Sequence, residues 1–418
     1  MEVSSYITLF SHNAKLYAYS YISKKIISVP PRVFVSLKNK SSENIRLKEA
    51  ELLSKHMFLT ENNEADIRQY IERTRNTDTL NVKIVVTTKC NFRCTYCYQS
   101  HTQFSSLSAD EESKALHWIV DKTESGKYSS LNINYYGGEP LLAKEVIYRM
   151  SSALQQKLPH IQLQFSITTN GYLVTRDILS ELCRHRIDTL SISIDGGQDY
   201  NDRRRKTVEG QGTYETVLKN ITVIAKEYPT IRLLLSMVVN ENDDTEIDKL
   251  CMDLVERGIS SRIDTTNIVI EKRFKDCRLS ISDQQKEQEK QANALVDYVR
   301  TLRKYGIKHN NIICNSDGIC KATRNNHFVI NVDGSLYGCA GLIEYPKLSL
   351  GSIDTLDTSY SRMHPEDDEC LHCCFAPVCL GGCRIESNHV SGKPDEKNCK
   401  KHYLEHISKR FLPVLVEE

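Results

Sequence analysis

Residues 83–97 read KIVVTTKCNFRCTYC, a β-branched run followed at once by three closely spaced cysteines. The run is typical of a buried strand, so Cys90, Cys94 and Cys97 are expected in the loop at its carboxyl end. Thiolates are soft ligands that suit iron-sulfur clusters, zinc or Cu(I). A [4Fe-4S] cube bound by three cysteines keeps one iron without a protein ligand, and that open position is reactive.

Zinc is the alternative occupant of this loop. A structural zinc site normally has four protein ligands. The nearest further cysteine, Cys183, lies 86 residues after Cys97, although His101 could complete the set. The ligand count therefore favours iron-sulfur chemistry over zinc.

Five more strand-like runs follow, separated by charged amphipathic segments. This alternation predicts repeated βα units, and hence an α/β fold with a parallel sheet that stays open or closes partly into a barrel. Such folds carry their chemistry in loops at the carboxyl ends of the strands. The six predicted strands are 83–88, 131–136, 163–169, 189–195, 231–239 and 262–270.

Glycine-containing turns follow three of these strands. They are Gly137-Gly138-Glu139-Pro140, Asn170-Gly171 and Asp195-Gly196-Gly197. Each turn taken alone is equally consistent with a simple strand exit. Together with the cysteine loop, they predict four loops that converge on one face.

Composition limits the possible partners and compartments. The 418 residues carry a net charge of +1, so no overall field attracts nucleic acid or an anionic membrane. The opening MEVSSYITLF lacks the features of a secretory signal, and no run of 18 apolar residues occurs. The 15 cysteines are an odd number, which excludes complete disulfide pairing. We therefore expect a soluble, cytoplasmic protein whose cysteines bind metal.

Four parts of the chain are distinguished by their patterns. The pattern of residues 1–80 predicts a small α+β module with a hairpin and two helices. Residues 81–275 form the predicted barrel, and residues 276–312 form a linker helix. Residues 313–418 contain nine of the cysteines.

The cysteine loop resembles the CxxxCxφC motif of the radical S-adenosylmethionine (SAM) enzymes, with Tyr96 at the aromatic position. The resemblance implies a partial (β/α)6 TIM-like barrel, a [4Fe-4S] cluster and reductive cleavage of SAM to a 5'-deoxyadenosyl radical. Many relatives read His-Asp-x-x-Arg where this chain has residues 200–204, and its three adjacent arginines also fit a solvated charge run. The implied SAM-binding residues are Tyr96, Gly137, Gly138, Glu139, Pro140, Asn170, Ser193 and Arg204.

The tail resembles the SPASM domain, the auxiliary-cluster extension of many peptide-modifying radical SAM enzymes. The resemblance rests on Cys320-x13-Gly334-x4-Cys339 and on Cys370-x2-Cys373-x5-Cys379-x3-Cys383 followed by Cys399. A pair of four-cysteine zinc sites is the alternative. The implied ligand sets are Cys314, Cys320, Cys339 and Cys383 for the first auxiliary cluster, and Cys370, Cys373, Cys379 and Cys399 for the second. The four cysteines that belong to no ligand set are Cys183, Cys251, Cys277 and Cys374.

The two resemblances imply an oxidoreductase with three [4Fe-4S] clusters that modifies or cross-links a precursor peptide. A flavodoxin- or ferredoxin-type protein would donate electrons, and no catalytic side chain is assigned. Sulfatase-maturating relatives carry a catalytic Asp directly after the Cys of Gly-x4-Cys, whereas this chain has Ala340. Residues 1–80 resemble leader-peptide recognition domains but are equally consistent with a stabilising cap. The alternatives are a sulfatase (formylglycine) maturase, another SPASM oxidoreductase, or a noncatalytic zinc or iron-sulfur protein.

Overall fold

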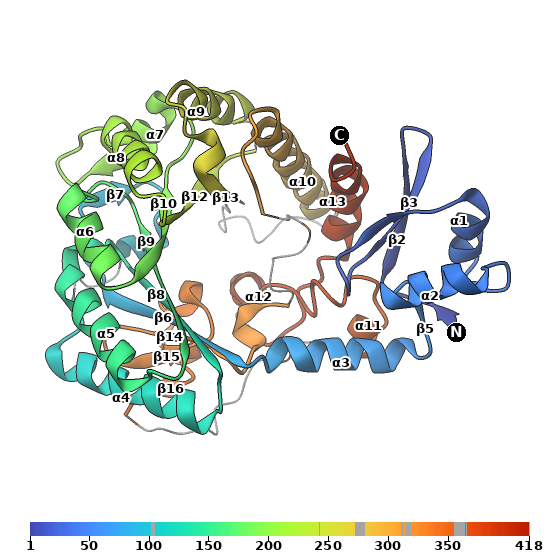
Figure 1. Cartoon of the computed structure of the whole chain (residues 1–418), viewed down its shortest axis with the longest axis horizontal. Coiled ribbons are helices and arrows are strands. Elements are labelled where there is room, and N and C mark those ends of the chain that lie inside the picture. The colour runs from blue at the N-terminus through green and yellow to red at the C-terminus, as the bar shows by residue number, and fades with distance from the viewer. Residues whose placement is uncertain are drawn as a thin grey trace.

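The computed structural model describes residues 1–101, 105–241, 243–271, 281–310, 313, 319–354, 364 and 366–417 (Figure 1). Cys277 and Cys314, both discussed above, lie outside these residues. Within the described part of the chain, no helix is long and apolar enough to cross a membrane.

A nine-stranded sheet organises the molecule. The six predicted strands lie in it as an unbroken series of parallel neighbours, which confirms the predicted α/β class. Their sheet order is β13-β12-β10-β9-β8-β6. The strands are β6 (Thr79–Thr87), β8 (Ser130–Gly137), β9 (Gln162–Thr169), β10 (Ile187–Ser193), β12 (Arg232–Val239) and β13 (Ile263–Ile270).

Helices cover the outer face of this curved sheet, as the left half of Figure 1 shows. Alternate strand residues such as Leu80, Val82 and Ile84 are almost fully buried in the core under the helices. Successive side chains on a strand point to opposite faces, so the residues between them face the inside of the barrel. The helices are α4 (Ala109–Ser125), α5 (Lys144–Lys157), α6 (Arg176–Arg184), α7 (Gln198–Arg204), α8 (Tyr214–Glu227) and α9 (Asp244–Glu256).

The cysteine loop contains a short strand that the sequence pattern did not predict. Strand β7 (Phe92–Cys94) pairs antiparallel with β11 (Arg205–Thr207), and Cys94 lies opposite Arg205. Three-residue strands leave no periodic signal, and this pair joins segments more than a hundred residues apart. The pairing anchors the cysteine loop to the segment that follows α7.

The cysteine-rich tail continues the barrel sheet. Strand β14 (His327–Ile330) pairs parallel with β6, and β15 (Ser335–Tyr337) and β16 (Gly351–Ser352) extend the sheet antiparallel. The tail also contains α11 (Asp368–Leu371), α12 (Arg384–Ser391) and α13 (Lys401–Val414). Helix α13 packs against α10 (Ile281–Lys304), which follows the barrel.

The N-terminal segment has a core of its own, which includes Val33, Leu37, Leu53 and Phe58. Strands β2, β3 and β4 form a three-stranded antiparallel sheet, and β1 pairs with β5. The right side of Figure 1 shows this segment beside α13. Its elements are β1 (Glu2–Val3), β2 (Ile7–His12), β3 (Lys15–Ser20), β4 (Ile26–Ser28), α1 (Pro31–Lys38), α2 (Leu47–Lys55), β5 (Leu59–Thr60) and α3 (Asn63–Arg75).

Candidate functional site

Three free thiols follow strand β6. Cys90, Cys94 and Cys97 are each partly buried, and the Cys97 amide donates to the Cys94 carbonyl at 3.2 Å. Burial, with smaller effects of Glu139, Cys94 and Cys97, raises the pKa of Cys90 to about 12. Thiols in such surroundings ionise when a metal supplies the compensating positive charge.

The donor set fits a cluster better than a single ion. The loop supplies three thiols, one fewer than the four protein ligands of a structural zinc site. The cysteines of a [4Fe-4S] cube each bind a different iron, so they stand farther apart than the ligands of one zinc. The Phe92 amide also donates to Cys90 Sγ at 3.3 Å, a contact that stabilises a cluster thiolate.

The Gly137-Gly138 turn lies directly on the backbone that enters the cysteine loop. A Cβ atom on Gly137, whose φ is +151°, would stand 2.0 Å from the Thr87 carbonyl oxygen. On Gly138 it would stand 2.4 Å from the Lys89 carbonyl oxygen. The Glu139 amide donates to that same oxygen at 2.8 Å. Only glycine fits this close approach of two loops.

Glu139 ties the second loop to the third. Its side chain is fully buried and accepts hydrogen bonds from the Leu141 amide at 3.0 Å and the Asn170 amide at 2.7 Å. The Thr169 hydroxyl donates a third, also at 2.7 Å. The Asn170 side chain in turn donates to Asn91 Oδ1 at 2.8 Å and to Cys90 Sγ at 4.0 Å. The first three loops are therefore held together by side chains.

We expect Glu139→Gln to lower the free energy of unfolding by about 2–4 kcal/mol, because an amide NH2 would face a backbone N–H donor. Burial raises the pKa of Glu139, so its ionisation costs stability as pH rises through that pKa. The variant should lose this pH dependence. Denaturant unfolding at several pH values measures both effects, with the exposed Glu209→Gln as the control. Equal stability of the two variants would contradict the anchoring role.

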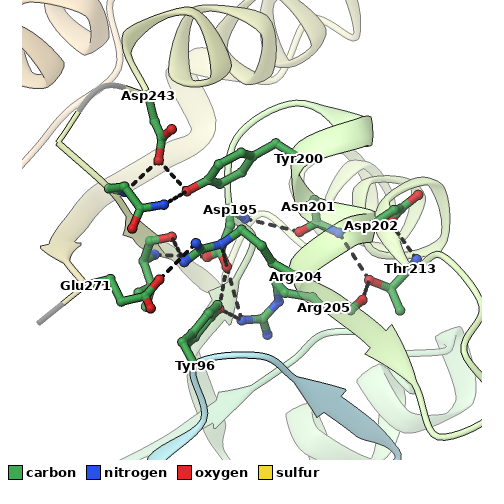
Figure 2. Close-up of polar contacts among 12 residues, drawn as sticks. Tyr96, Asp195, Tyr200, Asn201, Asp202, Arg204, Arg205, Thr213, Asp243 and Glu271 are labelled. Atoms are coloured by element: carbon green, nitrogen blue, oxygen red, sulfur yellow. Dashed lines mark hydrogen bonds and ion pairs between the residues drawn. The ribbon is translucent and has the colours of Figure 1, made fainter. Parts of the chain in front are cut away.

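Tyr96 enters a buried charged network with two residues that the sequence pattern does not assign to the site (Figure 2). Its hydroxyl donates to Asp195 Oδ2 and accepts from Arg205 Nη1. Asp195 is fully buried, and its Oδ1 accepts from the Val238 amide at 2.9 Å. From the sequence, Asp195 is only part of a turn and Arg205 only one of three arginines. The network joins the cysteine loop to strands β10, β11 and β12.

Arg204 lies beside this network. Its guanidinium stacks over the Tyr96 and Tyr200 rings at 4.6 and 4.8 Å, and Nη1 pairs with Glu271 at 2.9 Å. The buried Nε has no hydrogen-bond partner among the described residues, although Asp195 Oδ2 is 3.9 Å away. Only Arg203 of the three arginines is exposed, so the run is not a solvated patch. A buried, partly unsatisfied guanidinium near the cysteine loop suits a carboxylate ligand.

Ser193 ends strand β10 opposite Ser236 of β12. It alternates with the buried Ile192 and Ile194, so it faces the inside of the barrel. Tyr200 and Asn201, which replace the His-Asp pair, are both bonded within the protein (Figure 2). The Tyr200 hydroxyl donates to Asp243, and Asn201 donates to Thr213 Oγ1 at 3.1 Å.

Residues 84–254 match the Radical SAM superfamily. The protein carries a radical SAM domain. The matched segment includes the three cysteines, the Gly-Gly turn and the Asp195 network. Membership implies one [4Fe-4S] cluster and SAM as cofactors. Cys90, Cys94 and Cys97 are the side chains that would hold that cluster.

Relatives extend the likeness beyond the radical SAM domain. The cysteine-type anaerobic sulfatase-maturating enzyme of Clostridium novyi (strain NT) is 24% identical over 77% of this chain and 93% of its own length. The structure of anSMEcpe with bound AdoMet matches 81% of this chain and 98% of its own, with a TM-score of 0.63 and 19% identity. The structure of Streptococcus suis SuiB bound to precursor peptide SuiA matches 95% of this chain and 99% of its own, with a TM-score of 0.54 and 14% identity. The chain thus has a radical SAM domain, and its relatives over most of its length are sulfatase-maturating enzymes and SuiB.

Outside the radical SAM domain, electrostatic effects link Cys339 with Cys320 and Cys383, and Cys379 with Cys373 and Cys399. Burial, with smaller effects of the nearby Cys320 and Cys383 thiolates, raises the pKa of Cys339 to about 11. Burial also raises the pKa of Cys379, and Cys399 and Cys373 add to that effect. Cys370 lies one turn before Cys373, in α11. These effects agree with part of each expected ligand set, and the two sets themselves stay a prediction.

Proposed function

We propose that this radical SAM enzyme is a peptide maturase that oxidatively modifies or cross-links a residue of a ribosomally made precursor peptide. When reduced and loaded with SAM, the cluster supplies a 5'-deoxyadenosyl radical that abstracts hydrogen from unactivated carbon. The chain's own residues hold the SAM-facing loops together through Glu139, Asn170 and the Asp195 network. The two tail groups would hold auxiliary clusters, so that the chain contains three [4Fe-4S] clusters, and a flavodoxin- or ferredoxin-type protein would deliver electrons.

The main support for the proposal is the share of this chain that each set of solved structures covers. The SuiB structures cover 95–96% of this chain, whereas the anSMEcpe structures cover 80–81%. The difference is 14–16 percentage points of 418 residues, or roughly 60 residues, which is most of a small domain. One of the SuiB structures is bound to its precursor peptide. A fold shared over nearly the whole chain supports the same substrate class here.

Ala340 also supports a peptide maturase over a sulfatase maturase. It follows Cys339, at the position where sulfatase-maturating relatives carry their catalytic Asp. A methyl group cannot accept a proton. The sulfatase maturase remains the second candidate, because relatives of that activity match 75–77% of the chain.

The N-terminal segment is positioned to present a peptide to the rest of the enzyme. Its sheet docks on the tail: the Tyr21 hydroxyl bonds Ser408 Oγ at 3.0 Å and the Tyr21 ring contacts Phe375. The Tyr6 hydroxyl donates to the Leu371 carbonyl at 2.8 Å. Strand β4 is an edge of the three-stranded sheet, and an edge strand can add a peptide by β-augmentation. We propose that residues 1–80 bind the leader of the precursor.

The decisive experiment is anaerobic reconstitution of the full chain with the peptide encoded next to its gene. We expect about twelve irons per chain, reductant-dependent 5'-deoxyadenosine and a mass change in the peptide. The same peptide without its leader should be modified more slowly. If the enzyme oxidises a Cys or Ser of a sulfatase peptide and leaves the peptide encoded next to its gene unchanged, the sulfatase maturase becomes the preferred function. Bound zinc without SAM cleavage would refute both.

Cys373→Ala should separate SAM cleavage from product formation. We expect 5'-deoxyadenosine formation to fall by less than about tenfold, because the barrel cysteines are intact, while modified peptide is lost. Mass spectrometry and chromatography measure the two products. Cys183→Ala is the control, since Cys183 is exposed on α6 and belongs to neither ligand set. Equal product yields from both variants would contradict the assignment of Cys373.

A further inference from the structure

The inner face of strands β6, β8 and β9 is polar. Asn81 and Lys83 alternate with the buried Leu80, Val82 and Ile84, so they face the inside of the barrel. The same face continues across the two neighbouring strands with Asn132, Asn134, Ser166 and Thr168. Barrels filled only for stability carry bulky aliphatic residues in this position. The polar lining therefore points to a binding role.

Hydrogen bonds orient this lining toward Lys83. Asn134 Nδ2 donates to Ser166 Oγ at 2.9 Å and to Thr168 Oγ1 at 3.3 Å. Its Oδ1 is thereby directed to the Lys83 ammonium, which donates to it at 2.5 Å. Asn132 Nδ2 donates to Asn81 Oδ1 at 3.0 Å. The asparagines hold one another and hold the ammonium in place.

The Lys83 ammonium has no carboxylate partner among the described residues. Its Nζ lies 4.1 Å from the centre of the Tyr136 ring, and Asn134 takes one of its three N–H donors. Burial, together with a smaller effect of nearby Lys321, lowers the pKa of Lys83 to about 7, and the Cys339 thiolate opposes this change. A buried cation of this kind is stabilised most by an anion that completes its hydrogen bonds.

Lys83 also lies between the two cysteine regions. The hydroxyl of Tyr136 bonds that of Tyr98 at 2.9 Å, and Tyr98 directly follows Cys97. Tyr136 packs against the same apolar cluster as Cys339 and Ala340. A group held at Lys83 would therefore be near both the SAM-binding loop and the first auxiliary set.

We propose that Lys83, oriented by Asn134, binds a carboxylate of the peptide substrate inside the barrel. The carboxylate belongs either to an Asp or Glu side chain or to the peptide's C-terminus. The proposal rests on the proposed function for the identity of the substrate. The binding site itself is a property of the barrel and can be tested without the peptide.

The first experiment measures carboxylate binding directly. Anaerobically purified full-length protein is acetylated with a limiting amount of sulfosuccinimidyl acetate, and each lysine is followed by mass spectrometry. At saturating N-acetylglutamate amide, we expect acetylation of Lys83 to slow by about threefold or more. The exposed Lys219 should be unaffected, and N-acetylglutamine amide should protect neither residue. Equal reactivity of Lys83 with both probes would overturn the proposal.

The second experiment uses the modified peptide, once identified. Lys83→Gln should raise the KM for the peptide about tenfold, because one charged hydrogen bond is lost. Lys83→Arg should bring the KM part of the way back to that of the wild type. A set of peptide variants then identifies the carboxylate. In each variant, one Asp or Glu is changed to Asn or Gln, or the C-terminus is amidated. The bound carboxylate is the one whose removal makes the KM the same for the wild type and for Lys83→Gln.

The two experiments separate the two ways of failing. If the neighbouring peptide is never modified but N-acetylglutamate amide protects Lys83, the proposed function fails and the carboxylate site stands. If the peptide is modified but Lys83→Gln leaves its KM unchanged and instead shifts the reduction potential of an auxiliary cluster, Lys83 balances cluster charge and the carboxylate site is refuted.

Discussion

Cys94→Ala is expected to abolish SAM cleavage, with 5'-deoxyadenosine reduced by more than about a thousandfold. The variant removes one of the three thiols that follow β6 and leaves only two ligands on that loop. Cys94 lies in β7, opposite Arg205, so the pairing of β7 with β11 should survive because it uses backbone groups. The loss is therefore expected in iron content and chemistry and not in folding.

The measurements are iron per chain, 5'-deoxyadenosine after reduction, and circular dichroism. Cys183→Ala is the control, because Cys183 is exposed on α6 and belongs to none of the ligand sets. Retention of SAM cleavage by Cys94→Ala would refute the assignment of the loop. An unfolded variant would show in the circular dichroism, and Cys94→Ser then repeats the test with a smaller change in packing.

Gly137→Ala is expected to disrupt the SAM-binding face without removing any cysteine. The new Cβ would lie 2.0 Å from the Thr87 carbonyl oxygen, which is backbone and cannot rotate away. The φ of +151° adds strain that an L-residue does not tolerate. We expect the free energy of unfolding to fall by about 3–5 kcal/mol and 5'-deoxyadenosine formation to fall by about a hundredfold or more.

Gly210→Ala separates steric overlap from backbone strain. Gly210 also has a positive φ, of +83°, but nothing lies within 4 Å of its Cβ position. Gly210→Ala should lower the free energy of unfolding by about 1 kcal/mol and leave the rate of SAM cleavage near that of the wild type. Denaturant unfolding and product analysis of the two variants measure the difference. Similar losses in both would show that strain, and not the contact between the two loops, limits the site.

Much of the barrel could be predicted because its signals are local. The run at 231–239 is mostly apolar over the length of a strand, and β12 occupies Arg232–Val239. The pairing of Phe92–Cys94 with Arg205–Thr207 could not be predicted in this way, because each partner is too short to have a period. Strand β14 likewise carries no mark that it joins β6 across some 240 residues.

In the candidate site too, residues with a local sequence signal were predicted and residues that act through distant contacts were not. The three barrel cysteines and the Gly-Gly turn were evident from spacing alone. Asp195 and Arg205 were missed, since their roles depend on meeting Tyr96 from two distant strands. Neighbouring arginines in the sequence have opposite surroundings: Arg203 is exposed and Arg205 is buried. Neither composition nor charge distinguishes them.

The sequence by itself determined which residues can bind metal together within a loop and which loops follow strands, because covalent spacing limits how far such groups can separate. Only the tertiary structure decided what lies beside them: the glycine turn against Thr87, the docking of the N-terminal sheet on the tail, and the inward position of Lys83. Those contacts arise from the burial of side chains that are remote in the chain, and burial depends on the whole fold.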